Sequence, residues 1–184
     1  MPSPAEIRAR TGGQDVRRIT YSAEDIDRRV REMGEDITAH YPEGEDLLLL
    51  GLLKGSFIFM ADIVRHIARP LHVDFLVASS YGSGTISSGD LKLLYDPEAN
   101  LKDRHVLLVE DIVDSGHTMN RLIPMLERRE PRSLEIVALL HKHVAEELVK
   151  EPRWVGFDAP REFLVGYGLD HSENYRNLPF IASL

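Results

Sequence analysis

The feature that most restricts the fold is the uninterrupted apolar run LLLLGLL at residues 47–53. A run of this length suits a β-strand that is buried on both faces, as strands of parallel sheets are. It is far too short to cross a membrane, so no membrane partner is expected. The fold class then depends on what lies between this run and the other strand-like segments.

Strand-like and helix-like segments alternate along the chain. Apolar stretches of strand length are found at 71–80, 91–95, 105–109, 134–140 and 163–167. Helical spacing follows the N-cap pair Ser22 and Asp25, recurs in FIFMADIVRHI at 57–67, and returns from about Gly116, where Pro124 predicts a short or kinked helix. The alternation predicts an α/β domain with a central, mostly parallel sheet flanked by helices.

Length and composition narrow the class further. The chain has 184 residues, which suits one domain with a sizeable core, and we expect residues 1–15 to form a flexible tail. Cys is absent, which excludes disulfides and thiolate metal sites and fits the cytoplasm, the location that we predict. The formal net charge of −8 disfavours a nucleic acid as the main partner.

The segment VLLVEDIVDSGHTMN at 106–120 carries the strongest chemical signal. A strand followed by a turn of small residues and a helix exposes backbone N–H groups that bind phosphate, and Gly116 lets the backbone approach closely. Ligands of α/β sheets bind at such carboxyl ends of strands. The carboxylates before the turn cannot favourably contact phosphate, so they must face sugar hydroxyls, a divalent cation or a transferred proton. A phosphorylated sugar with Mg²⁺ meets all of these demands.

Three other interpretations of this segment are less well supported by its residues. Two acids directly after a four-residue apolar run make an ordinary strand end followed by a helix cap unlikely. The sequence LLVED is similar to the acidic strand end of receiver domains, but in those domains it lies near the start of the chain. A P-loop nucleoside triphosphatase is disfavoured because G-x-x-x-x-G-K-[ST] does not occur.

The segment resembles the phosphoribosyl diphosphate (PRPP) motif of type I phosphoribosyltransferases: a hydrophobic run, two acids, two hydrophobic residues, D-[ST]-G and Thr. The resemblance covers about Ile19 to Leu184 and is narrowed by other landmarks to the bacterial hypoxanthine-guanine branch. The resemblance implies the type I phosphoribosyltransferase fold, with a small hood formed by the N- and C-terminal segments. It also implies a ribose-phosphate site made of Glu110, Asp111, Asp114, Ser115, Gly116, His117 and Thr118.

The same resemblance assigns the other parts of the site. Lys54 and Gly55 match the diphosphate loop, in which a strained Lys–Gly peptide turns its N–H toward the ligand, and Arg176 matches a diphosphate-binding residue. Ser80 and Tyr81 match the start of a mobile lid. Lys142, Phe163, Leu164 and Asp170 match the purine site, where an ammonium group favours a 6-oxo over a 6-amino group. Glu110, Asp111 and Asp170 are the expected Mg²⁺ residues.

The implied activity is transfer of the 5-phosphoribosyl group from PRPP to N9 of hypoxanthine or guanine, with Asp114 as the catalytic acid and base. The family suggests a homodimer or homotetramer. His117 departs from the family's usual turn residues, and His141 and His143 are expected to be structural or solvated. Two alternatives stay open: a related enzyme that prefers xanthine, and a non-catalytic PRPP sensor.

Overall fold

The computed structural model describes residues 2–80, 91–144 and 147–184. Its helices are α1 (Pro4–Thr11), α2 (Ala23–His40), α3 (Phe57–Ile63), the 3-10 turn η1 (Val64–His66) and α4 (His117–Glu127). Its strands are β1 (Arg18–Tyr21), β2 (Leu47–Leu53), β3 (Leu71–Ser80), β4 (Leu91–Tyr95), β5 (His105–Val113), β6 (Ser133–His141), β7 (Trp154–Asp158), β8 (Leu164–Val165) and β9 (Ile181–Ser183).

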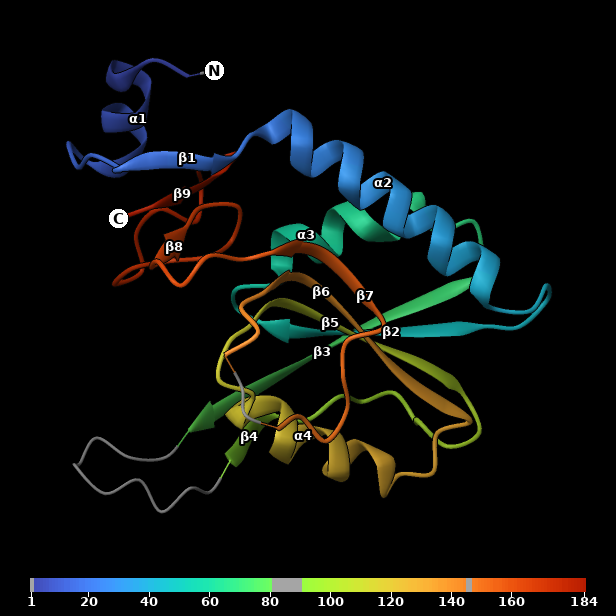
Figure 1. The fold of residues 1–184 in the computed structure, drawn as a ribbon. Helices are drawn as coiled ribbons and strands as arrows, with labels where there is room; N and C mark the ends of the chain where they lie inside the picture. The colour runs from blue at the N-terminus through green and yellow to red at the C-terminus, as the bar shows by residue number, and fades with distance from the viewer. Residues whose placement is uncertain (1, 81–90, 145–146) are drawn as a thin grey trace.

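A six-stranded sheet in the order β4-β3-β2-β5-β6-β7 forms the centre of the molecule. Strands β3, β2, β5, β6 and β7 are parallel to one another, and β4 pairs with β3 in the antiparallel direction. Helices α2 and α3 cover one face and α4 covers the other (Figure 1). The predicted α/β architecture with a mostly parallel sheet is therefore confirmed.

Alternate residues of β2 supply the two halves of the core, as the two-residue repeat of a strand requires. Leu47 and Leu49 pack in a cluster that contains the buried stripe of α2, whereas Leu48 and Leu50 pack with the apolar residues of α4. The Ser22 side chain accepts a hydrogen bond from the backbone N–H of Asp25 at 3.1 Å and caps α2 as predicted. An uninterrupted leucine run is thus what a central strand with helices on both faces needs.

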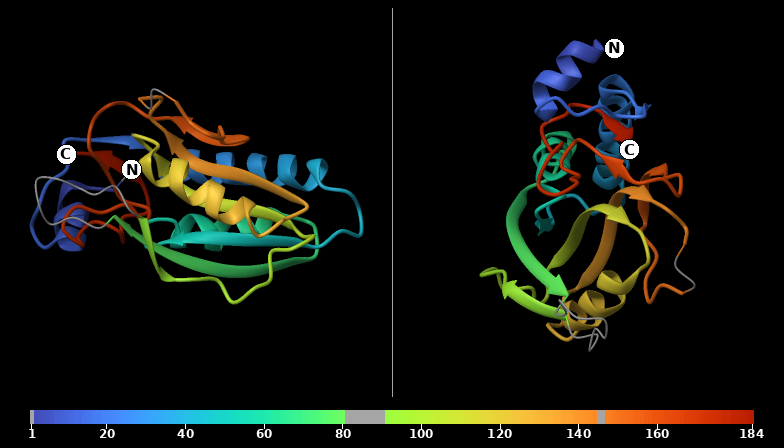
Figure 2. Two further views of the ribbon diagram at one scale, coloured as in Figure 1. Left: turned by 90° about the horizontal axis from the view of Figure 1, so that it is seen from below. Right: turned by 90° about the vertical axis from the view of Figure 1, so that its left-hand side faces the viewer.

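The hood is a second sheet in the order β1-β9-β8, built from the two ends of the chain. It lies beyond the ends of the central strands, with the N-terminal helix outside it (Figures 1 and 2). Residues 4–11, within the segment 1–15 that was predicted to be a tail, form helix α1. Ser3 and Glu6 form a reciprocal capping box at the start of α1, and Ile7 is buried against the hood.

Two strand predictions also need correction. The sixth strand of the central sheet is β7, which was not predicted, whereas the segment at 163–167 contributes only the two-residue β8 to the hood. Strand β5 continues to Val113, past the predicted end at residue 109, so both Glu110 and Asp111 belong to the strand. Within the described ranges, no helix has the length and apolarity needed to span a bilayer.

Candidate active site

A cleft of about 450 Å³ lies where the hood faces the carboxyl ends of the central strands. Its lining includes residues from six separate segments of the chain, and these contain most of the predicted site. They are Leu53, Lys54, Gly55, Val77, Ala78, Asp111, Ile112, Asp114, Lys142, Phe163, Leu164, Leu169, Asp170, Glu173 and Arg176. The structure therefore brings together the predicted diphosphate loop, catalytic acid and purine-site residues.

A smaller pocket of about 80 Å³ lies next to this cleft, over the turn between β5 and α4. Its lining contains Glu110 and every residue from Asp114 to Thr118, so it includes the whole predicted phosphate turn. Gly116 occupies the N-cap position of α4 with a left-handed φ of 76°, which glycine adopts without steric strain. The first N–H groups of α4 face no earlier helical turn, so this end of the helix suits an anion.

The two acids at the end of β5 lie in different environments. Glu110 is buried and faces the smaller pocket, and its Oε2 atom has no hydrogen-bond partner among the described residues. Asp111 lines the larger cleft, and its Oδ1 accepts a hydrogen bond from the Ile112 N–H at 2.8 Å. Burial raises the pKa of Glu110 well above its ordinary value, with a further contribution from Asp111, and burial raises the pKa of Asp111 to about 6.

A pH-dependent stability effect should follow from the burial of Glu110. Because its folded-state pKa lies above the ordinary 4.5, the ligand-free protein should lose stability as the pH rises from about that value through the folded pKa. Glu110→Gln removes this titratable group. The melting temperature of the variant, relative to that of the wild type, should therefore be higher at pH 8 than at pH 5. Thermal melts at both pH values measure this; a difference between the two proteins that does not change with pH would contradict it.

At the end of the cleft predicted to bind the purine, Lys142 and Asp114 form an ion pair. Lys142 Nζ lies 2.9 Å from Asp114 Oδ2, and only 12% of the Lys142 side chain is exposed. Phe163 is unusually open for a phenylalanine, with 53% of its surface exposed, and it meets the ring of His171 edge-on at 5.3 Å between centroids. A charged donor, a carboxylate and an exposed aromatic ring lining one cleft suit a flat heterocycle with polar edges.

At the other end of the cleft, two cations lie among carboxylates. Arg176 donates from Nη1 to the Gly168 carbonyl at 2.7 Å, and its Nη2 lies 2.8 Å from Asp170 Oδ1. Glu173 contacts both Arg176 and Lys54. These positive groups are suitably placed for an anionic ligand, provided that the ligand displaces the carboxylate contacts.

The predicted diphosphate loop follows β2 directly, and the peptide bond between Leu53 and Lys54 is cis. Gly55 itself is required by close packing, because an added Cβ would lie 1.6 Å from Asp111 Oδ2. On its other side, a Cβ on Gly168 would lie 2.2 Å from the Gly55 carbonyl oxygen. The hood, the loop and Asp111 are therefore in direct contact.

Four carboxylates line the cleft: those of Asp111, Asp114, Asp170 and Glu173. Even so, the described residues contain no group of three or more His, Asp or Glu side chains that could enclose a metal ion. This arrangement fits Mg²⁺, which keeps several waters and commonly takes its remaining ligands from one or two carboxylates and a substrate phosphate. Glu110, the third expected Mg²⁺ residue, lines the smaller pocket and is not among the cleft residues.

Of the two predicted lid residues, Ser80 is the last residue of β3, and Tyr81 lies outside the described residues. Sequence reasoning missed Glu173 and Gly168. The signal was their position in the sequence: Glu173 lies between Asp170 and Arg176, and Gly168 lies between Leu164 and Asp170, all of which had been assigned to the site.

His141 and His143 stay outside the cleft lining, in agreement with their assignment as structural or solvated. His141 is buried, and its ring lies 3.8 Å from that of His143, centroid to centroid. His143 is exposed and its Nε2 lies 2.6 Å from Asp158 Oδ1. The two histidines thus support the strand end that carries Lys142.

Comparisons with known proteins agree with this site. A phosphoribosyl transferase domain matches residues 21–172. Hypoxanthine phosphoribosyltransferase of Haemophilus influenzae is 42% identical over 168 residues, which are 90% of this chain and 94% of that protein. The structure of Bacillus anthracis hypoxanthine-guanine phosphoribosyltransferase superposes with a TM-score of 0.86 at 40% identity, covering 92% of this chain and 99% of that one.

Some relatives are much longer. The bifunctional TilS/HprT protein of Listeria innocua is 42% identical over 170 residues, and the chain spans 26% of its length.

The parallel sheet, the phosphate turn after β5 and the matching domain define a phosphoribosyltransferase of type I. Within that class, the chain belongs to the family of hypoxanthine-guanine phosphoribosyltransferases.

Proposed function

We propose that the chain transfers the 5-phosphoribosyl group from PRPP to N9 of hypoxanthine or guanine and releases diphosphate, which is a purine salvage reaction. One observation carries the proposal. The 450 Å³ cleft is lined by the Lys142–Asp114 pair at its purine end and by Lys54, Gly55 and Arg176 at its diphosphate end, and the phosphate turn lies beside it. This order of groups matches the order of base, ribose and diphosphate in the reacting complex.

The chemistry exchanges one bond at C1′ of ribose for another. The bond from C1′ to the diphosphate oxygen breaks, the bond from C1′ to purine N9 forms, and a proton leaves the purine. Positive charge develops on the ribose as the diphosphate departs, and the departing group becomes more negative. Lys54, Arg176 and the backbone N–H of Gly55 would stabilise that negative charge. Glu110 and Asp111 would hold the ribose hydroxyls.

Mg²⁺ would assist this reaction. Asp111 and Asp170 would hold it in the cleft, and Glu110 is the third residue predicted to bind it. When bound, the metal neutralises the charge of the diphosphate and so makes it a better leaving group. Asp170 is already oriented by Arg176 at 2.8 Å. Asp111, whose pKa is raised to about 6 by burial, would be ionised at neutral pH.

The base would be read by Lys142 and Phe163. The Lys142 ammonium donates to the 6-oxo group, and the exposed ring of Phe163 stacks on the purine. Backbone groups near Leu164 would contact the base edge. Asp114 would exchange the proton at purine N7, and the ion pair with Lys142 holds it beside the base position before a purine enters.

A substrate comparison tests the activity. The purified chain, supplied with PRPP and Mg²⁺, should show kcat/KM for hypoxanthine and guanine far above that for adenine. Preference for xanthine would support the related 6-oxopurine enzyme instead. PRPP binding without transfer to any of the four bases would favour a PRPP sensor and contradict the proposal. The homodimer or homotetramer and the cytoplasmic location stay predictions.

A substitution at Lys142 tests the assignment of the purine end. Lys142→Ala should raise the KM for hypoxanthine by roughly 10- to 100-fold, the size expected from losing one hydrogen bond to a charged donor. The KM for PRPP should change little. Lys102→Ala is a suitable control, because Lys102 pairs with Glu130 outside the cleft. A raised KM for PRPP with unchanged use of hypoxanthine would show that Lys142 does not read the base.

A further inference from the structure

One carboxylate occupies the cations that the proposed function assigns to diphosphate. Glu173 Oε1 lies 3.0 Å from Lys54 Nζ, and Glu173 Oε2 lies 3.3 Å from Arg176 Nη2. The two oxygens of one side chain thus bridge two cations, as two oxygens of a phosphate group can. Lys54 and Glu173 are 119 residues apart in the sequence, so the fold, and not local geometry, brings them together.

Arg176 does not depend on Glu173 for its position. Its Nη1 donates to the Gly168 carbonyl and its Nη2 contacts Asp170, and only 19% of its side chain is exposed. The side chains of Glu173 and Lys54 are each 66% exposed. Glu173 therefore lies at the rim of the cleft, where its carboxylate can swing into water without disturbing the guanidinium behind it.

The backbone places Glu173 firmly at this rim. Its N–H donates to Asp170 Oδ2 at 2.9 Å, and its φ of 63° is in the left-handed region, so the residue lies in a tight turn after Asp170. The backbone thus fixes the Cα of Glu173, while 66% of its side chain is exposed. An exposed carboxylate held beside two cations is placed to compete with an incoming anion.

We propose that Glu173 is an internal competitor of diphosphate. Its carboxylate binds Lys54 and Arg176 in the ligand-free protein, is displaced from them by PRPP, and binds them again when diphosphate leaves. The inference rests on the proposed function. Glu173 is a positioning residue in this scheme, because it acts on substrate through the two cations. Its effect is to weaken diphosphate binding and to hasten release of that product.

The test compares Glu173→Gln with the wild type in the full-length chain. Glutamine keeps the shape and the backbone hydrogen bond but loses the charge. Calorimetric titration with inorganic diphosphate in magnesium-containing buffer should show binding about two- to fivefold tighter in the variant, as expected from removing exposed ion pairs that compete for the ligand. The KM for hypoxanthine should not change. The difference should shrink at high salt, because exposed charges are screened.

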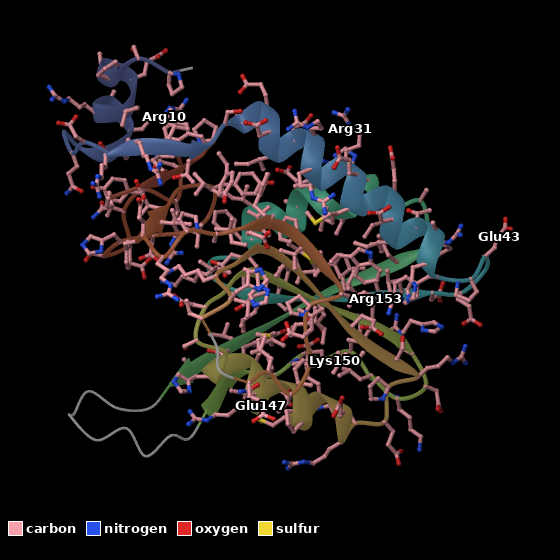
Figure 3. The ribbon with its side chains drawn as sticks, viewed as in Figure 1. Arg10, Arg31, Glu43, Glu147, Lys150 and Arg153 are labelled. Carbon is pink, nitrogen blue, oxygen red and sulfur yellow. The ribbon has the colours of Figure 1, made fainter. Side chains whose placement is uncertain are left out.

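Two further variants sharpen the result. Glu173→Asp, whose shorter side chain reaches the two cations less well, should fall between the wild type and Glu173→Gln. Glu45→Gln makes the same charge change at an ion pair with Arg132, 2.6 Å apart. Residue 45 is two residues from Glu43, which lies at the end of the molecule away from the hood (Figure 3). Because it is far from the cleft, Glu45→Gln should leave diphosphate binding unchanged.

The outcomes separate this inference from the proposed function. If the wild type transfers phosphoribosyl groups but Glu173→Gln binds diphosphate equally or more weakly, Glu173 supports the site and only the competition is refuted. If the wild type neither binds diphosphate nor transfers the phosphoribosyl group, both fail. A tighter complex in Glu45→Gln would assign the effect to net charge and would also refute the competition.

Discussion

Asp114→Asn should lower kcat by a factor on the order of 10²–10⁴, the usual contribution of general acid–base catalysis. The amide has the shape of the carboxylate but cannot exchange the purine proton. Asp114 faces the cleft, where its Oδ2 is 2.9 Å from Lys142 Nζ. Steady-state kinetics with hypoxanthine give the turnover number, and calorimetric titration gives the affinity for PRPP, which should change much less.

A matched control separates this effect from a change in charge. Asp96→Asn removes a carboxylate that pairs with Arg129 outside the cleft, and its kcat should stay close to that of the wild type. Near-normal turnover in Asp114→Asn would exclude Asp114 as the proton acceptor. Loss of PRPP affinity to the same extent as turnover would instead assign it to ribose-phosphate binding.

Gly55→Ala should lower kcat/KM for PRPP by about 10²-fold, the size that a displacement of about 1 Å in an active site can produce. The new methyl group would lie 1.6 Å from Asp111 Oδ2, so either the loop or the carboxylate must move. The loop has little freedom, because the Ser56 hydroxyl donates to the Leu52 carbonyl at 2.6 Å and Gly168 packs against the Gly55 carbonyl. Kinetics with varied PRPP measure the loss.

Gly44→Ala provides the control for this substitution. Gly44 lies in the connection between α2 and β2, and a Cβ there would meet nothing within 4 Å, although its φ of +82° adds strain. This variant should lose some stability but keep its kcat/KM. An unchanged kcat/KM in Gly55→Ala would mean that the contact with Asp111 has no part in PRPP binding.

Much of the central sheet could be predicted from the sequence, because its strands are continuous apolar runs. Residues 47–53 and 71–80 each form a strand over nearly the predicted bounds. Strand β7 was missed because Gly156 interrupts a short apolar segment. The structure gives the reason for that glycine: a Cβ would lie 2.4 Å from the Leu139 carbonyl oxygen of the neighbouring strand. The periodicity of apolar residues along a sequence does not predict such contacts between neighbouring strands.

The site residues could be named from local motifs, but their partners could not. The turn from Asp114 to Thr118 is contiguous in the sequence, and its small pocket follows from the strand–turn–helix geometry. The pairs Lys142–Asp114 and Lys54–Glu173 join segments 28 and 119 residues apart. Those pairings depend on which strands are neighbours and on how the hood is placed, and these are properties of the tertiary structure.

The central claim is that the acids of β5 and the turn before α4 bind one phosphorylated ribose. A crystal structure of the chain with a purine nucleoside 5′-monophosphate tests it most directly. The account predicts the phosphate oxygens against the backbone of residues 115–118 and the ribose hydroxyls beside Glu110 and Asp111. A phosphate bound instead at Lys54 and Arg176, with the turn left empty, would contradict it.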